Sequence, residues 1–507
     1  MFFVIVVMLI NGGHQMSDIM TYHMLINGKA VQARDGGSFE SIDPSTGQVW
    51  ARIPAATEED VNEAVEAAHQ ALSGPWGDMT PSMRGKLLGK LADLLAEHSE
   101  AIGRIETKDT GKLFKETRWQ CQYIAEYLHY YAGAADKLSG DTLPIDKPDM
   151  FVFTKREPLG VIAAVIPWNS QMFLSIVKIG PALATGNTIV LKASEHASAP
   201  LLELGKLIQQ AGIPDGVVNI VTGTGDPCGR ALTTHPKVAR IAFTGGTSSA
   251  QHIIRNSAEN FAEVSLELGG KSPFIVFDDA NIESAVNGAV AGIFGASGQS
   301  CVAGSRLYLH EAIADEFLAK MIQIAKGIKI GDPQADDTEM GPLCTPAQIS
   351  LITEQVAIAQ SEGGQVLTGG KARPDLGGLY FEPTIIDCPR QDMSLVHTEL
   401  FGPVLAVQRF TSEDEILSMA NDSDYGLAAG IFTTNHARAH RMSQNIKAGI
   451  VWVNTYRAIS PIAEFGGMKH SGHGREAGFQ ALYDYTRPKT VWMSTSDEPL
   501  ANPFQPR

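Results

Sequence analysis

Residues 158–169, PLGVIAAVIPWN, are a short apolar run rich in β-branched side chains that ends in a turn. A run of this kind is typical of a strand that is covered on both faces of a parallel sheet. Helix-like and strand-like segments alternate downstream of it, and this alternation indicates βαβ units and a doubly wound parallel sheet. It predicts helices at 178–187, 199–212 and 247–260, and strands at 188–194, 216–223, 238–246 and 262–270.

The second half of the chain repeats the alternation, so we predict an α/β fold with two doubly wound, Rossmann-like domains. A chain of 507 residues is longer than one hydrophobic core usually serves, which agrees with two or three domains. We expect the chain to pass from the first domain to the second near 267–271. The other predicted elements are strands at 273–277, 306–310 and 448–454, and helices at 57–72, from about 81 to 102, near 115–138, at 281–294 and at 312–327.

Composition limits the classes of partner. The formal net charge is −16, with 44% hydrophobic and 19% charged residues, which is an ordinary balance for a soluble globular protein. No basic patch stands out, so we expect neither a nucleic acid nor a membrane surface as partner. The five cysteines are scattered without a CxxC pair, and the fourteen histidines show no metal-binding spacing. We therefore expect a cytoplasmic protein without disulfides or a metal site.

The N-terminal residues do not fit the pattern of the rest. Residues 1–10, MFFVIVVMLI, are apolar but too short to span a bilayer, and they lack the basic start and cleavage site of a signal peptide. Residues 22–31, YHMLINGKAV, read as the start of a fold. We expect residues 1–23 to be a non-native or disordered extension and not a membrane anchor.

Two glycine-rich turns each join a predicted strand to a predicted helix. They are NIVTGTGDPCG at 219–229 and AFTGGTSSA at 242–250. A phosphate can approach such a turn because glycine has no Cβ and the next helix offers its N-terminus. Lys192 and Glu195 follow another strand at the same end of the sheet, where open α/β sheets bind ligands. From these residues alone, the two turns could form a nucleotide-binding site or be ordinary surface turns.

Cys301 lies in FGASGQSCVAGSR, residues 294–306, among residues that are nearly all small. A structural cysteine is usually packed among large apolar side chains, whereas a nucleophile needs room and nearby N–H groups. Glu267 ends the apolar strand of SLELGGKSP, residues 265–273, where a carboxylate with a raised pKa would serve as a general base. A helix cap or an ion pair is the alternative for Glu267. The residues alone leave both questions open.

Seven motifs, in this order along the chain, resemble the aldehyde dehydrogenase superfamily. The resemblance covers the chain from about residue 24 to the C-terminus. The motifs are PWN at 167–169, LKASE at 191–195, FTGGT at 243–247, LELGGKSP at 266–273, GQSCVAGSR at 298–306, ELFGPV at 399–404 and EFGGMKHSGHGRE at 464–476.

The resemblance implies a reaction and its residues. The Cys301 thiolate would attack a small-molecule aldehyde, a hydride would pass to NAD, and water activated by Glu267 would hydrolyse the resulting thioester. The Asn169 amide and the Cys301 backbone N–H would form the oxyanion hole. Physical chemistry agrees, because an oxyanion needs preorganised donors that are worth roughly 3–4 kcal/mol each.

The resemblance also implies where the cofactor binds. Lys192 and Glu195 would hold the adenosine ribose, which favours NAD over NADP, and Gly245 would lie at the pyrophosphate. Glu399 would reach the nicotinamide ribose, and Phe401 would border the nicotinamide. The full set of implied contacts is Ile166, Pro167, Trp168, Lys192, Glu195, Gly225, Gly229, Phe243, Gly245, Gly246, Leu268, Glu399 and Phe401.

Three positions depart from the family pattern. Gly246 stands where serine is frequent, Ala250 where glycine is usual, and Ala296 where asparagine often precedes the nucleophile. Each departure would loosen or reposition the cofactor without removing a group that the chemistry needs.

By the same resemblance, residues 24–140 and 159–270 would form the NAD-binding domain and 271–485 the catalytic domain. Residues 141–158 and 486–507 would be oligomerisation segments that include a small β-hairpin. The strand near 489–493 would pair with this hairpin across a dimer, and the protein would be a homodimer or homotetramer.

Other functions compete with hydrolytic aldehyde oxidation. A CoA-acylating semialdehyde dehydrogenase typically lacks the glutamate at 267, a cofactor-independent cysteine hydrolase leaves the glycine-rich turns unexplained, and a purely structural protein would not need Cys301.

The substrate side of the site would include Phe465 and Arg457. Arg457 would either bind a carboxylate of the substrate or order its own loop.

Overall fold

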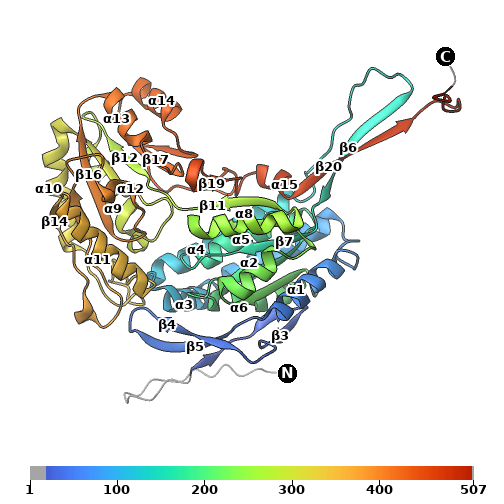
Figure 1. The fold of residues 1–507 in the computed structure, drawn as a ribbon, viewed down its shortest axis with the longest axis horizontal. Coiled ribbons are helices and arrows are strands. Elements are labelled where there is room, and N and C mark those ends of the chain that lie inside the picture. The colour runs from blue at the N-terminus through green and yellow to red at the C-terminus, as the bar shows by residue number, and fades with distance from the viewer. Residues whose placement is uncertain (1–18, 505–507) are drawn as a thin grey trace.

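The computed structural model describes residues 19–504, so residues 1–18 of the predicted extension lie outside the described range. The first sheet has eight strands in the order β19-β11-β10-β7-β8-β9-β2-β3 (Figure 1). Its five central strands run parallel, and β19 and β2 join them antiparallel. The strands are β2 Met24–Ile26, β3 Lys29–Val31, β7 Val161–Val165, β8 Thr188–Ala193, β9 Val218–Thr222, β10 Val238–Thr244, β11 Glu263–Glu267 and β19 Gly472–His473.

Helices cover both faces of this sheet. Thr57 caps α1, because its hydroxyl accepts from the N–H of Asp60 and the Asp60 carboxylate accepts from the N–H of Thr57 at 2.8 Å. The helix predicted from Pro81 is broken at His98, whose φ of −97° and ψ of 10° end α2 and begin α3. The helices are α1 Glu58–Ala71, α2 Pro81–Glu97, α3 Ser99–Thr110, α4 Phe114–Ala134, α5 Gln171–Ala184, α6 Ala199–Ala211, α7 Arg230–Thr233 and α8 Thr247–Asn260.

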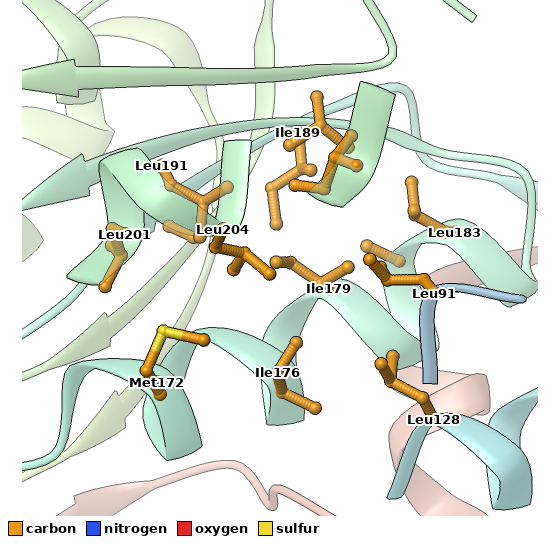
Figure 2. Close-up of a cluster of buried hydrophobic side chains, with 14 of the residues drawn as sticks. Leu91, Leu128, Met172, Ile176, Ile179, Leu183, Ile189, Leu191, Leu201 and Leu204 are labelled. Atoms are coloured by element: carbon orange, nitrogen blue, oxygen red, sulfur yellow. The ribbon is translucent and has the colours of Figure 1, made fainter. Parts of the chain in front are cut away.

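Helix α5 lies at the centre of the largest apolar cluster. Figure 2 shows Met172, Ile176, Ile179 and Leu183 of α5 among leucines and isoleucines of α2, α4, β8 and α6. A helix that is apolar around most of its circumference must be buried on all sides, and nearly every residue of α5 is. The loop between β7 and α5 is therefore held firmly at both ends.

The second sheet has seven strands in the order β14-β15-β16-β13-β12-β17-β18, all parallel except β14. The chain leaves the first sheet after β11 and enters the second at β12, which agrees with the predicted transition near 267–271. The elements are β12 Pro273–Val276, β13 Arg306–His310, β14 Gln365–Thr368, β15 Thr384–Asp387, β16 Val404–Phe410, β17 Ala428–Phe432, β18 Ile450–Val453, α9 Ile282–Phe294, α10 Glu311–Gly327, α11 Pro346–Ser361, α12 Ser394–His397, α13 Glu413–Asn421, α14 His436–Asn445 and α15 Gln480–Asp484.

Residues near the C-terminus return to the first sheet. Strand β19 pairs with β11, and α15 contacts α5. The predicted range 271–485 therefore does not coincide with the second sheet. Short single-turn segments connect other elements, namely η1 Gly225–Gly229, η2 Gly295–Gly298, η3 Pro374–Leu376 and η4 Lys469–Ser471.

A two-stranded arm, made of β6 (Met150–Pro158) and β20 (Thr486–Ser494), projects from the body and carries the C-terminal residues at its tip (Figure 1). The two strands pair antiparallel within one chain, along the whole length from Thr486 opposite Pro158 to Ser494 opposite Met150. The strand at 486–494 therefore pairs with the predicted hairpin segment within one chain, and not across a dimer as predicted.

A third sheet, of order β1-β5-β4, lies beside the first (Figure 1). Its strands are β1 Met20–Thr21, β4 Ser38–Asp43 and β5 Gln48–Pro54. The fold was predicted to begin at residue 24. It begins earlier, because Met20 and Thr21 already pair with β5. None of the helices between residues 19 and 504 has the length and apolarity needed to cross a bilayer.

Candidate active site

Cys301 follows a left-handed turn at the end of α9, and we call residues 295–301 the cysteine turn. Ala296, Ser297 and Gly298 have φ angles of 52°, 54° and 74°. Left-handed backbone costs a residue with a Cβ roughly 1–2 kcal/mol, so the turn must be held from outside. The contacts that hold it are Ala296 N–H to Glu116 Oε1 at 3.1 Å, Ser297 Oγ to Gly341 O at 2.8 Å, and Cys344 N–H to Gln299 Oε1 at 2.8 Å.

The thiol faces a cavity of about 520 Å³, which we call the thiol cavity. Its size suits a small organic molecule. Burial raises the pKa of Cys301 to about 12, the carboxylates of Glu267 and Glu399 raise it further, and Arg457 and the Val302 N–H oppose them. The thiol is therefore protonated at neutral pH and needs a base to become a nucleophile.

Glu267 places a carboxylate on the wall of the thiol cavity. It ends β11 as predicted, it is 4% exposed, and neither carboxylate oxygen has a hydrogen-bond partner within residues 19–504. Burial and then the charge of Glu476 raise the pKa of Glu267 well above its usual value, against the opposing charges of Lys178 and Arg475. A carboxylate with a raised pKa accepts protons near neutral pH.

A buried ion pair lies behind Glu267. Lys178 of α5 is fully buried, pairs with Glu476 and donates to Thr244 Oγ1 at 2.7 Å. This pair was not predicted from the sequence. A lone lysine in the apolar run of α5 was the available signal, because a buried lysine needs a carboxylate partner.

Asn169 lies in the loop between β7 and α5 and lines the thiol cavity. Its side-chain N–H donates to Gln299 O, two residues before Cys301, at 3.2 Å. The structure thus brings Asn169, Glu267 and Cys301 to one cavity from three distant parts of the chain. An amide donor beside a thiol and a buried carboxylate can support nucleophilic attack on a carbonyl.

A second cavity, of about 580 Å³, adjoins the thiol cavity at Thr244, which lines both. We call it the glycine cavity. A Cβ added at Gly225 or Gly246 would meet nothing within 4 Å, and α8 begins after Gly246 without a side-chain cap. Open backbone at a helix N-terminus fits a phosphate group. The predicted residues that line it are Ile166, Pro167, Trp168, Lys192, Glu195, Gly225, Gly229, Phe243, Gly245 and Gly246.

Three predicted cofactor residues lie outside the glycine cavity. Leu268 lines the thiol cavity, whereas Glu399 and Phe401 line a small cavity beside the cysteine turn. Glu399 accepts from the Gly270 N–H at 2.9 Å, and burial raises its pKa to about 7. The ring of Phe401 contacts that of Trp168 edge-on, at 5.3 Å between centroids, and this contact joins the small cavity to the glycine cavity.

Lys192 and Glu195 lie at the same edge of the glycine cavity, 3.5 Å apart. Lys192 is inside β8 and not after it as predicted, because the strand continues to Ala193. Hydroxyl groups suit such a pair, because the ammonium donates hydrogen bonds and the carboxylate accepts them. His252 and Asn256 of α8 also line this cavity and were not predicted.

Arg457 and Phe465 line the thiol cavity. Arg457 Nη1 donates to Ala291 O at 3.0 Å, at the C-terminal end of α9, where a cation also complements the helix dipole. One part of the guanidinium therefore orders the loop while the side chain still borders the cavity. Glu116, Trp119 and Phe173 border it as well and were not predicted.

Between residues 19 and 504, no group of three or more His, Cys, Asp or Glu side chains is placed to hold a metal ion.

Known proteins resemble the chain over almost its whole length. A family model described as the aldehyde dehydrogenase family matches residues 31–491. The (Z)-2-((N-methylformamido)methylene)-5-hydroxybutyrolactone dehydrogenase of Acinetobacter baylyi is 54% identical over 95% of this chain and 99% of its own. An aldehyde dehydrogenase of Emericella nidulans is 42% identical over 94% and 95% of the two chains. The NAD⁺ complex of a Bacillus cereus aldehyde dehydrogenase has a TM-score of 0.92 at 41% identity, over 94% of this chain and 97% of that one.

Proposed function

The chain belongs to the aldehyde dehydrogenase family, and we propose that it oxidises a carboxylate-bearing aldehyde through a covalent intermediate on Cys301. The reaction is the NAD-dependent oxidation of an aldehyde. One observation carries the proposed mechanism: the thiol and the carboxylate of Glu267 share a cavity that adjoins the glycine cavity at Thr244.

The first step is addition of the Cys301 sulfur to the aldehyde carbon. A C–S bond forms, the thiol loses its proton to Glu267, and the carbonyl oxygen becomes an oxyanion. The side-chain amide of Asn169 and the backbone N–H of Cys301 donate to that oxygen. NAD, when bound in the glycine cavity, supplies the acceptor for the hydride that leaves the same carbon. Each oxyanion donor is worth about 10²–10³-fold in rate.

The second step releases the acid. Glu267 first releases the thiol proton to solvent and then takes a proton from a water molecule, whose oxygen attacks the thioester carbon. The C–S bond breaks, and the Cys301 thiolate recovers its proton from Glu267 as the acid ionises. The sum is one aldehyde, one NAD⁺ and one water giving a carboxylate, NADH and two protons. Burial raises the pKa of Glu267, which makes its carboxylate a stronger base than an exposed glutamate.

The cofactor residues fit NAD. Lys192 and Glu195 would hold the adenosine ribose, and the backbone at Gly245 and Gly246 would take the pyrophosphate. A glutamate at the ribose accepts from its 2′-hydroxyl and repels a 2′-phosphate. We therefore infer a preference for NAD over NADP.

The substrate class follows from one relative and one side chain. The A. baylyi enzyme is named for a 5-hydroxybutyrolactone, and the ring-opened form of such a lactone is an aldehyde that also carries a carboxylate. Arg457 puts a cation on the wall of the thiol cavity, where it can pair with that carboxylate. We infer that the substrate is a short oxo acid or its cyclic form.

Replacement of Cys301 by alanine tests the mechanism. The variant should lose aldehyde oxidation and still bind NAD, as measured by isothermal titration. Turnover above a few per cent would exclude Cys301 as the nucleophile. A product released only as a CoA thioester would favour the acylating alternative.

Arg457→Ala tests the substrate class. We expect KM to rise for a semialdehyde acid and to stay nearly constant for a neutral aldehyde of equal length. An equal effect on both substrates would mean that Arg457 does not bind the carboxylate and only orders its loop through the hydrogen bond to Ala291 O. Lys115→Ala is the matched control, because Lys115 lines the same cavity and donates to Thr338 O at 2.7 Å.

The arm is the proposed contact with a second copy of the chain. Phe151, Trp492 and Met493 are 45%, 56% and 50% exposed, which is unusual for such large apolar side chains. We infer a homodimer or homotetramer in which another copy covers them. Trp492→Lys should lower the mass measured by light scattering, and an unchanged mass would place the interface elsewhere.

The cysteines support a cytoplasmic location. All five are free thiols, and four of them are buried. Free thiols persist most readily in a reducing compartment.

A further inference from the structure

The cysteine turn holds two residues with a Cβ in a conformation that favours glycine. Ala296 and Ser297 are left-handed in succession, and both are buried. Strain of this kind persists only when neighbouring groups fix it, and it concentrates at functional sites. The residues that fix the turn are therefore part of how the thiol is placed.

Glu116 fixes the first of these residues. It lies in the first turn of α4, and its Oε1 accepts from the Ala296 N–H at 3.1 Å. Its Oε2 is buried and has no hydrogen-bond partner between residues 19 and 504, and the side chain lines the thiol cavity. A hydrogen bond to a carboxylate is stronger than one to a neutral acceptor, which suits a strained donor.

The other contacts of the turn come from different parts of the chain. Ser297 is tied to Gly341, and the carbonyl of Gln299 accepts from Asn169. The Glu116 contact is thus what ties the entry of the turn to α4. A shift of Ala296 would be transmitted along the turn to Cys301, five residues later.

We propose that Glu116 is a positioning residue that holds Ala296 in its left-handed conformation and thereby orients the Cys301 thiol toward Asn169 and the substrate. The inference rests on the proposed role of Cys301 as nucleophile. It concerns the hydrogen-bond acceptor that Glu116 offers to Ala296, and the charge of Glu116 only strengthens that bond. Glu116→Gln should therefore preserve the function, because the amide oxygen of glutamine also accepts a hydrogen bond from the Ala296 N–H.

The test measures the pre-steady-state burst of NADH together with the affinity for NAD. Glu116→Ala should slow the burst about tenfold, the typical cost of one hydrogen bond to a charged group. Glu116→Gln should stay within about threefold of the wild type. The affinity for NAD should not change in either variant, because Glu116 does not line the glycine cavity.

Rescue at Ala296 separates this role from general damage. Glycine adopts the left-handed region without cost, so Ala296→Gly combined with Glu116→Ala should recover most of the lost burst rate. Glu116→Asp is a second variant, should the alanine variant fail to fold. The aspartate keeps the charge, but its side chain is one methylene shorter and cannot reach the Ala296 N–H. The burst of Glu116→Asp should therefore be slowed as in Glu116→Ala. Glu126→Ala, an exposed carboxylate on the same helix, is the matched control.

Three results would overturn the proposal. They are a normal burst in Glu116→Ala or Glu116→Asp, a glutamine variant as slow as the alanine variant, and a double variant that glycine does not rescue. Failure of the underlying function is distinguishable. It would show as remaining turnover in Cys301→Ala, whatever the Glu116 variants do.

Discussion

Gly298 should be among the least replaceable residues of the site. It has a φ of +74°, and a Cβ added there would lie 2.1 Å from Gly402 O and 2.2 Å from Gly402 C. Both are backbone atoms, so no side-chain rotation can relieve the contact. Gly402 belongs to the segment that carries Glu399 and Phe401, and the cysteine turn therefore packs backbone to backbone against it.

The displacement caused by Gly298→Ala follows from these distances. Contacts of a Cβ below 3.0 Å are essentially never seen, so the two segments must separate by at least the difference between 3.0 and 2.1 Å, or 0.9 Å. A misplacement of about 1 Å in an active site costs on the order of 10²-fold in rate. The left-handed conformation adds roughly 1–2 kcal/mol of strain for alanine. We expect a burst about 10²-fold slower and a lower melting temperature.

The assay is stopped-flow detection of NADH together with thermal unfolding. Gly133→Ala is the matched control, because a Cβ at this position of α4 would meet nothing within 4 Å, and alanine favours a helix by about 1 kcal/mol over glycine. The control should keep full activity and melt at the same or a higher temperature. If Gly298→Ala kept more than half of the burst rate, the tight backbone contact would not control the thiol.

Three further predictions concern Glu267 and the cofactor. Glu267→Gln should slow the burst of NADH, because the Cys301 thiol loses its base, and should let a thioester accumulate, because hydrolysis loses its base as well. A burst at the wild-type rate would restrict Glu267 to hydrolysis, and a slow burst without accumulated thioester would restrict it to thiol activation. Because the pKa of Glu267 is raised when the chain is folded, stability falls as pH rises from the usual value of 4.5 through the raised value. The melting temperature of Glu267→Gln should therefore exceed that of the wild type by a margin that grows as the pH rises above 4.5. NADP should be used about tenfold less efficiently than NAD because of Glu195, and Glu195→Gln should narrow this gap; equal efficiency of both cofactors in the wild type would refute the assignment.

Local pattern was sufficient for the parts of the fold that depend on neighbouring residues. The strand at 161–165, the helix that begins after Thr57 and the end of β11 at Glu267 all occur as predicted. Each depends on contacts within a few residues or on burial of both faces of a strand. The break at His98 was missed, because the apolar pattern continues across it and only packing separates α2 from α3.

The sequence by itself determined the fold class, the family and the identities of Cys301, Glu267 and Asn169 as candidates, because ordered motifs carry that information. Tertiary structure alone decided which groups meet. Lys178 reaches Glu476 across 298 positions, and Glu116 reaches Ala296 across 180. The pairing of β6 with β20 inside one chain was decided in the same way. Such contacts form when distant segments are buried together, since a buried charge or a strained N–H must find whatever partner the packing brings to it, and no local spacing records that partner.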